Sequence, residues 1–135
     1  YNNLLELFHK NEFLVKIIDR DFKENLDFYK YPNRYSNINP LFHRDKNISI
    51  LKIIEKKLEK NNFLMSDDFS FLDYCIFPFI RQFRNVDPEW FENLEFYKIN
   101  KWYSFIVESS EFNDIMKKYK VWKSSDVPII TNFKY

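Results

Sequence analysis

Residues 69–78 read Phe-Ser-Phe-Leu-Asp-Tyr-Cys-Ile-Phe-Pro, and this stretch has the pattern of a helix start. Ser70 is placed to be the N-cap, where its hydroxyl can accept a backbone N–H from the first turn. Asp73 lies three residues later, from where its carboxylate can reach back to the Ser70 N–H and complete a capping box. Phe69 and Tyr74 flank the cap at the spacing of a hydrophobic staple. We therefore expect a helix to begin here.

The helix that follows is expected to run to Phe83 and is apolar nearly all round. A helix without a polar face is typical of the centre of a bundle, so we expect this one to be central and buried. Pro78 lies well inside it, where it removes one backbone hydrogen bond and should kink the helix.

Upstream of this helix, apolar residues recur at spacings of three and four, the period of an amphipathic helix. Residues 3–29 read as one long helix with one gap in the pattern near Asn11. A second helix is expected over 44–60. Between them we expect a loop, because Pro32 and Pro40 each push the preceding residue out of helical geometry.

Downstream, three shorter helices are expected. Asp87 is the cap of the first, with Pro88 at its first helical position. The apolar residues of 99–107 mark the second. Ser109 or Ser110 caps the last, which carries Phe112, Ile115, Met116 and Tyr119.

The composition fits one all-α domain over residues 1–135, a bundle of five to six helices. The chain contains no glycine, so it has no Gly-rich phosphate loop and no nucleophile elbow. Its formal charge of +1 argues against nucleic acid and anionic membranes as partners. A single cysteine excludes an internal disulfide and favours a reducing, cytoplasmic location. No apolar run reaches the length of a membrane span.

Residues 69–78 resemble the capping-box helix of glutathione transferase C-terminal domains, in which a Ser-x-x-Asp element opens the buried central helix. Three further stretches are similar to one bacterial branch of that family. They are residues 22–35, residues 79–91 and the end Met116-Lys117-Lys118-Tyr119-Lys120-Val121-Trp122.

The resemblance implies the helical half of such a protein only. The family carries a thioredoxin-like domain in front, which binds glutathione and supplies the catalytic Ser, Tyr or Cys. Nothing in this chain matches that domain, so we expect it to be absent here, with no catalytic residue, no bound cofactor and no activity in this chain alone. Glutathione would be a co-substrate of the full-length protein, which we expect to be a homodimer.

Four residues are candidates for substrate binding on this resemblance. Arg81 and Gln82 lie at the level where the central helix approaches the hydrophobic substrate pocket, and a charge there can orient an anionic ligand. Arg20 and Lys23, with Asp19 as a weaker candidate, lie where the first helix faces the missing domain. The alternatives are an ion pair or a solvated position for Arg81, and an ordinary charged helix face for the others.

The remaining candidates have structural interpretations. Ser70 and Asp73 are expected to serve folding, and Cys75 to be a packed, inert thiol among apolar neighbours. His9 and His43 have no metal-ligand spacing. The three tryptophans are expected to be core or rim anchors; they are Trp90, Trp102 and Trp122.

Three functions remain open from the sequence. The first is the substrate-pocket and dimerisation domain of a glutathione transferase-like protein, which transfers glutathione to electrophiles or reduces mixed disulfides. The second is a non-catalytic protein-interaction module. The third is a carrier of apolar ligands.

Overall fold

The computed structural model describes residues 2–116 of the chain, and residues 1 and 117–135 lie outside the described part. Every regular element of the described part is helical, which confirms the all-α prediction. The elements are α1 (Asn2–Ile17), the π-helical turn η1 (Ile18–Phe22), α2 (Lys23–Lys30), the 3₁₀ turn η2 (Pro32–Arg34), α3 (Pro40–Leu58), α4 (Phe71–Val86), α5 (Pro88–Glu92), α6 (Tyr97–Val107) and α7 (Ser110–Ile115).

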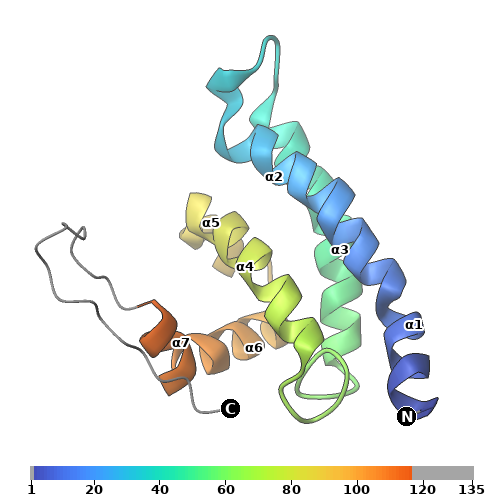
Figure 1. The fold of residues 1–135 in the computed structure, drawn as a ribbon. Coiled ribbons are helices and arrows are strands. Elements are labelled where there is room, and N and C mark those ends of the chain that lie inside the picture. The colour runs from blue at the N-terminus through green and yellow to red at the C-terminus, as the bar shows by residue number, and fades with distance from the viewer. Residues whose placement is uncertain (1, 117–135) are drawn as a thin grey trace, which may run out of the picture.

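The long first helix is confirmed, because α1, η1 and α2 follow one another without a break (Figure 1). Counted as one, they bring the described helices to six, within the five to six predicted. The stripe that faces the core consists of Leu14, Ile18, Phe22, Leu26 and Tyr29. Leu4 and Phe8 continue the same apolar spacing in the sequence, but they lie outside the residues whose side chains are described.

The sequence did not predict the π-helical turn in the middle of this helix. Its last two carbonyls accept hydrogen bonds from side chains: Asn25 Nδ2 donates to Asp21 O at 2.9 Å, and Asn47 Nδ2 donates to Phe22 O at 3.1 Å. Asn25 Oδ1 in turn lies 2.8 Å from His43 Nδ1. Two residues of α3 thus support the π-helical turn: Asn47 binds it directly, and His43 binds it through Asn25. Side-chain hydrogen bonds of this kind suit a π-helical turn, which interrupts the regular hydrogen bonding of the helix.

The prediction for the start of α3 was wrong. The helix begins at Pro40, four residues before the expected position, and ends at Leu58. Asn39 is its N-cap, and the Asn39 side chain accepts hydrogen bonds from the N–H groups of Leu41 and Phe42 at 3.1 and 3.3 Å. Pro40 therefore opens the helix: its fixed φ suits the first position, and the N–H it lacks would have had no helical partner there.

The helix α4 (Phe71–Val86) begins as predicted, continues beyond the predicted end at Phe83, and is buried on one side only. Six side chains face the core: Leu72, Asp73, Ile76, Phe77, Ile80 and Phe83. On the opposite side Phe71 and Tyr74 are 69% and 57% exposed, and Pro78 and Gln82 are exposed as well. The expectation of burial nearly all round was therefore wrong for this face. The helix continues through Pro78, and the kink there stays a prediction.

Asp73 does more than cap α4. Ser70 and Asp73 form the predicted capping box, with Asp73 Oδ2 accepting hydrogen bonds from Ser70 N–H at 2.9 Å and from Ser70 Oγ at 2.7 Å. The other oxygen, Oδ1, accepts hydrogen bonds from Leu64 N–H at 2.9 Å and from Trp102 Nε1 at 2.8 Å. The carboxylate is completely buried. It therefore joins the start of α4 to the preceding loop and to α6. The predicted staple is also present, with the rings of Phe69 and Tyr74 6.2 Å apart.

A second carboxylate caps a helix across the bundle. Glu55 of α3 accepts hydrogen bonds from the N–H groups of Lys98 and Ile99 in the first turn of α6, at 2.9 and 2.8 Å. A negative charge at this end is favourable because it meets unpaired N–H groups and the positive end of the helix dipole. The contact helps to hold α6 against α3.

The short helices start as predicted. Asp87 Oδ1 accepts the Trp90 N–H at 3.1 Å at the head of α5, and Ser109 Oγ accepts the Phe112 N–H at 3.2 Å at the head of α7. Ser109, rather than Ser110, is thus the cap. The helix α7 ends at Ile115, and Tyr119, predicted to belong to it, lies outside the described residues.

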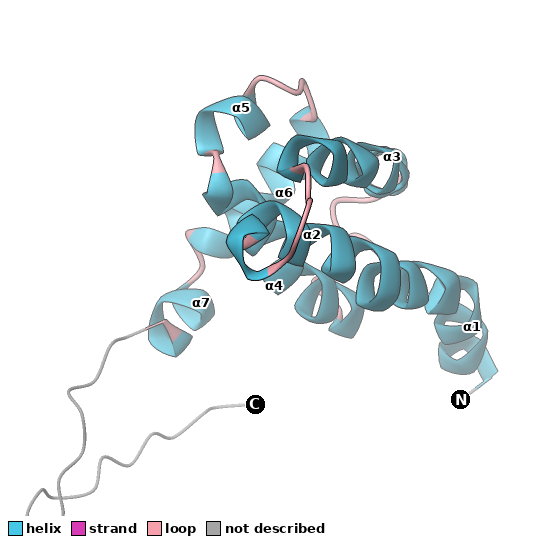
Figure 2. Ribbon diagram, turned by 90° about the horizontal axis from the view of Figure 1, so that it is seen from above, coloured by secondary structure: helices cyan, strands magenta, loops and turns pink. Residues whose placement is uncertain are grey.

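The helices enclose one apolar core. Figure 2 shows α2, α3, α4 and α6 grouped together, with α7 at one end of the molecule. Trp102 of α6 lies in the core, and Trp90 packs at its rim against Arg44, as expected for anchors, whereas Trp122 is outside the described part. Across residues 2–116, each helix is too short or too polar to cross a lipid bilayer.

Candidate functional site

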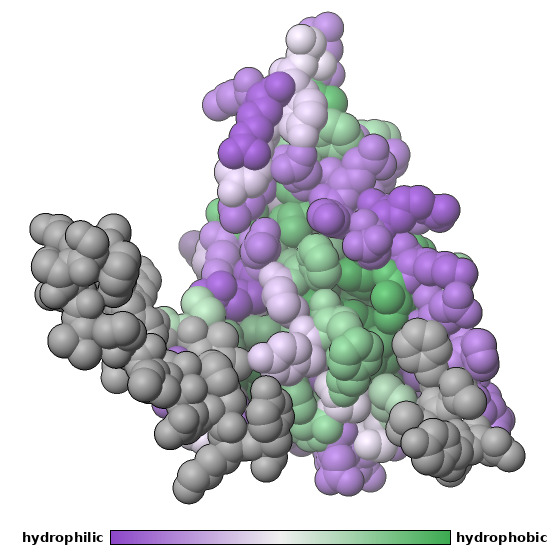
Figure 3. Space-filling view, viewed as in Figure 1, coloured by the Kyte–Doolittle hydropathy of each residue, from purple (hydrophilic) through white to green (hydrophobic). Residues whose placement is uncertain are grey.

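The exposed face of α4 borders two hollows in the surface. This face consists of Phe71, Tyr74, Pro78 and Gln82. Figure 3 shows apolar side chains gathered over the middle of the molecule, in the region that α4 occupies in Figure 1. Gln82 borders both hollows, so the face and the hollows form one continuous surface.

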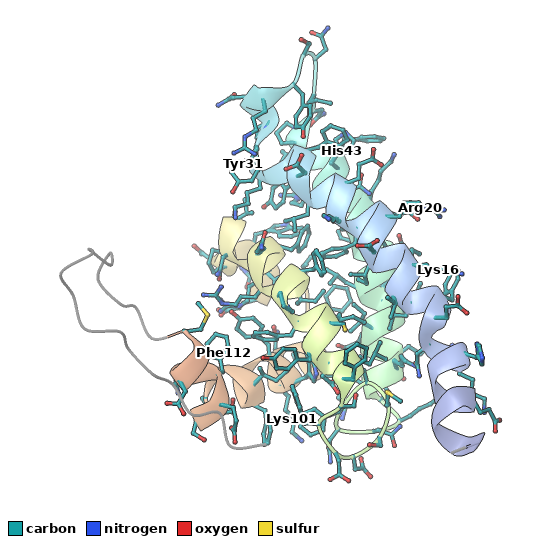
Figure 4. The ribbon with its side chains drawn as sticks, viewed as in Figure 1. Lys16, Arg20, Tyr31, His43, Lys101 and Phe112 are labelled. Atoms are coloured by element: carbon teal, nitrogen blue, oxygen red, sulfur yellow. The ribbon has the colours of Figure 1, made fainter. Side chains whose placement is uncertain are left out.

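The first hollow, which we call the polar hollow, has a volume of about 640 Å³ and lies between the long helix and α4. Its lining residues are Asp19, Arg20, Lys23, Glu24, Leu26, Asp27, Lys30, Tyr31, Phe79 and Gln82. Three bases and three acids are among them, so their charges balance. Two of its lining residues, Arg20 and Tyr31, are labelled in Figure 4.

The three cations of the polar hollow differ in whether a carboxylate or an aromatic ring already contacts them. Arg20 is largely exposed, and its Nε lies 3.1 Å from Asp21 Oδ1, which raises the pKa of the guanidinium. Lys30 lies over the Tyr31 ring, with Nζ 5.1 Å from its centroid. Within residues 2–116, Lys23 forms no ion pair. Lys23 is therefore the cation best placed to meet an incoming anion.

The second hollow, which we call the aromatic pocket, has a volume of about 620 Å³ and lies between α4, α6 and α7. Its lining residues are Phe69, Tyr74, Phe77, Pro78, Arg81, Gln82, Phe105, Ile106, Ser109, Glu111, Phe112 and Met116. Phe112 projects from α7 towards α4, as Figure 4 shows, and its ring centroid is 5.5 Å from that of Phe77. The Arg81 guanidinium lies 5.6 Å from the Phe112 centroid.

The four substrate-binding candidates thus fall into two groups. Arg20 and Lys23 border the polar hollow, Arg81 borders the aromatic pocket, and Gln82 borders both. Their roles in binding stay predictions. The sequence did not single out Phe105 and Phe112, which form walls of the aromatic pocket. Phe105 falls off the buried stripe of α6, and an aromatic residue on that outer face was the available signal.

The remaining titratable candidates take structural positions. Cys75 is half-buried, and burial raises the pKa of its thiol, so the neutral and less reactive form is favoured. The ring of His43 packs against Phe28 and Phe42. In residues 2–116 no three His, Cys, Asp or Glu side chains come together as a metal site.

Comparison with known proteins identifies the fold. The chain is 28% identical over 124 residues to a CDC123-like protein of Acanthamoeba polyphaga mimivirus, a match that covers 89% of this chain and 34% of that protein. The chain thus spans about a third of that relative's length. No solved structure matches the chain. The family model for the glutathione S-transferase C-terminal domain matches residues 43–123, which is more than half of the chain. This match includes α4 to α7, most of α3 and the capping box on which the resemblance rested, and the chain therefore belongs to the glutathione S-transferase C-terminal domain family.

Proposed function

We propose that this chain is the helical, substrate-pocket half of a glutathione transferase-like protein. The observation that carries the proposal is the exposed face of α4, which is mostly apolar and meets the polar hollow at Gln82. Large apolar side chains gathered on one face of a protein commonly mark a surface that another domain or protein covers. In the proposal, a thioredoxin-like domain of the same polypeptide covers this face.

The polar hollow then becomes one side of a cleft between two domains. Lys23 supplies a free ammonium and Gln82 an amide, which suits a peptide-like ligand with carboxylates such as glutathione. Phe79 and Tyr31 supply apolar surface for the electrophile. Interfaces between domains are among the common places for small-molecule sites.

The chemistry is divided between the halves in this proposal. The full protein transfers the glutathione thiolate to an electrophile or reduces a mixed disulfide, and the thioredoxin-like half activates the thiol. This chain binds and orients the second substrate and excludes water, and it has no catalytic residue of its own. Cys75, its one thiol, is kept neutral by burial and takes no part. The full protein acts as a homodimer in the cytoplasm.

The first test is to determine the coding sequence upstream of the Tyr1 codon, over about 100 codons, one domain's length. A thioredoxin-like pattern in frame, with a Ser, Tyr or Cys near its start, is the expected result. A different kind of domain there would refute the proposal.

The second test addresses the polar hollow in the full-length protein. Lys23→Gln should raise the KM for glutathione about fivefold, the effect of one charge-assisted contact, with little change in kcat. Lys101→Gln is the matched control, since it removes the same charge from an exposed site on α6 that borders neither hollow. Equal KM values in the two variants would contradict a role for Lys23.

A second candidate function is a non-catalytic docking module. It is favoured by the match to a CDC123-like protein of which this chain spans 34%, a description that names no transferase. In this case the α4 face binds another part of a larger polypeptide or assembly. Glutathione binding by the intact natural protein separates the two: calorimetric binding supports the transferase, and its absence supports the module.

A further inference from the structure

One side of α3 and of the turn after it carries lysines in a row, and we call it the basic face. Four of its lysines are exposed and one is half-buried, and Ile53, which is 40% exposed, lies among them. From residue 46 to residue 60 the face covers about 21 Å of helix, at 1.5 Å per residue. Figure 2 shows α3 at the edge of the helix group. The basic face consists of Lys46, Lys52, Ile53, Lys56, Lys57 and Lys60.

These lysines lack the carboxylate partners that lysines have on α1. There Lys10 and Lys16 each pair with the glutamate four positions before, at 3.2 and 2.8 Å. Within residues 2–116, no lysine of the basic face belongs to an ion pair. Lys46 lies instead over the Phe42 ring, with Nζ 4.7 Å from the centroid. Glu55 of the same helix is engaged by the first turn of α6. The ammonium groups are therefore available to an anion from outside.

The lysines also repel one another. Lys52, Lys56 and Lys60 follow at intervals of four, and like charges at this spacing are neighbours on a helix surface and destabilise it. The Lys60 N–H donates to Lys57 O at 3.3 Å, which keeps these two residues on one turn. Burial and then the Lys60 ammonium lower the pKa of Lys57. A bound anion would relieve this repulsion, because it places negative charge among the lysines.

The surroundings of the basic face favour an acidic protein segment over nucleic acid or a membrane. The exposed acids Asp45 and Glu59 lie beside its two ends, and the formal charge of the whole chain is only +1. The attraction is therefore local rather than spread over a broad surface. Ile53 adds an apolar contact among the lysines, which an amphipathic segment can use and a phosphate backbone cannot.

We propose that the basic face of α3 docks an acidic amphipathic segment of another protein, with its carboxylates on the lysines and an apolar side chain on Ile53. The chain's own residues 117–135 are themselves rich in lysine, and a second copy docked through the same face would set lysine against lysine. The partner is therefore a different protein. None of the six residues borders the polar hollow or the aromatic pocket, so the inference rests on neither function proposed above.

Synthetic peptides test the chemistry of the partner. The acidic probe is a fluorescein-labelled peptide of about 15 residues, the length of the face, made of glutamate with a leucine at every third or fourth position. One control peptide has glutamine in place of each glutamate, and the other has serine in place of each leucine. Fluorescence anisotropy with the whole chain, at about 0.05 M salt, should show the acidic probe bound at least about tenfold more tightly than the glutamine peptide. Its binding should weaken as salt is added, because salt screens exposed charges.

Variants locate the site. Replacement of both Lys52 and Lys56 by glutamine should weaken the acidic probe about fivefold. The thermal midpoint should not fall, because the change removes a repulsion. The matched control replaces Lys10 and Lys16 by glutamine, which removes the same charge from lysines that already have partners, and it should change binding by less than about twofold. Ile53→Ala should weaken the acidic probe about threefold and leave the serine peptide unchanged.

Three results would overturn the proposal. The first is equal affinity of the acidic and the glutamine peptides for the wild-type chain. The second is an equal effect of the two double variants, which would mean that net charge and not the basic face holds the peptide. The third is tighter binding of a single-stranded RNA or of phosphatidylserine vesicles than of the acidic probe, which would assign the face to nucleic acid or to a membrane. Glutathione binding is measured separately, so failure of one proposal leaves the other standing.

Discussion

The sharpest consequence of the structure concerns Asp73. If this residue were only part of a capping box, Asp73→Ala would cost about 1 kcal/mol of stability, as helix caps do. The structure gives it two further partners, Leu64 N–H and Trp102 Nε1, both in buried residues. Removal of the carboxylate leaves both donors unpaired, at a cost of about 1–3 kcal/mol each. We therefore expect a total loss of roughly 3–7 kcal/mol.

Urea unfolding at pH 7, followed by circular dichroism, measures this loss. With a slope of about 2 kcal/mol per M, the midpoint should fall by roughly 1.5–3.5 M. Ser70→Ala is the matched control, because it removes the cap and leaves the two long-range bonds, and it should cost only about 1 kcal/mol. If Asp73→Ala proves too unstable to measure, Asp73→Asn is the alternative, because it keeps one carbonyl oxygen for Leu64 and Trp102. Its loss of stability should lie between the losses expected for Ser70→Ala and Asp73→Ala.

A double-mutant cycle with Trp102→Phe isolates one bond. In the Trp102→Phe background the indole donor is gone, so Asp73→Ala should cost about 1–2 kcal/mol less than in the wild type. Equal losses for Ser70→Ala and Asp73→Ala, or no coupling in the cycle, would refute the view that Asp73 links three parts of the fold.

Three other predictions follow from single contacts. Glu55→Gln should lower the free energy of unfolding by about 1 kcal/mol, because an amide is a weaker cap for α6 than a carboxylate. Urea unfolding measures the loss. The control is Glu59→Gln, just beyond the end of α3, which makes no such contact with α6. Alkylation of Cys75 by iodoacetamide at pH 8 should be slower in the folded chain than in urea, because burial raises the pKa of the thiol and less thiolate is present. Mass spectrometry measures the two rates, and equal rates would contradict the burial. Glu95→Gly should raise the free energy of unfolding by about 0.5–1 kcal/mol, because Glu95 has φ 62°, which glycine adopts without strain. The thermal midpoint should therefore rise slightly, and a lower midpoint would contradict this reasoning.

Local signals in the sequence predicted the fold well. The capping box, the staple and the Asp87-Pro88 start each involve residues within five positions of one another, and the structure contains all of them. The error at α3 was also local: Pro40 was assigned to the loop because it keeps Asn39 out of helical geometry, which is correct, although Asn39 as N-cap and Pro40 at the first position favour a helix start.

The contacts that join helices could not be predicted in this way. Asp73 meets Trp102 across 29 positions and Glu55 meets Ile99 across 44. Nothing in either stretch alone indicates its partner. The same holds for the candidate site, where Gln82 was foreseen but Phe105 and Phe112 were not, because the aromatic pocket forms only when α6 and α7 pack beside α4.

The apolar composition of α4 misled for a related reason. A helix that is apolar all round is expected to be buried, yet here Phe71 and Tyr74 are exposed. In our proposal another domain covers this face, so the sequence reports an environment larger than the chain itself. The exposed face and the family match thus support one account.

The most direct test of that account is the conjugation of glutathione to 1-chloro-2,4-dinitrobenzene, measured for this chain and for the complete natural protein that contains it. The account predicts turnover above the uncatalysed rate for the complete protein and none for the chain alone. Turnover by the chain alone, or none of any kind by a complete protein that has a thioredoxin-like half, would contradict it.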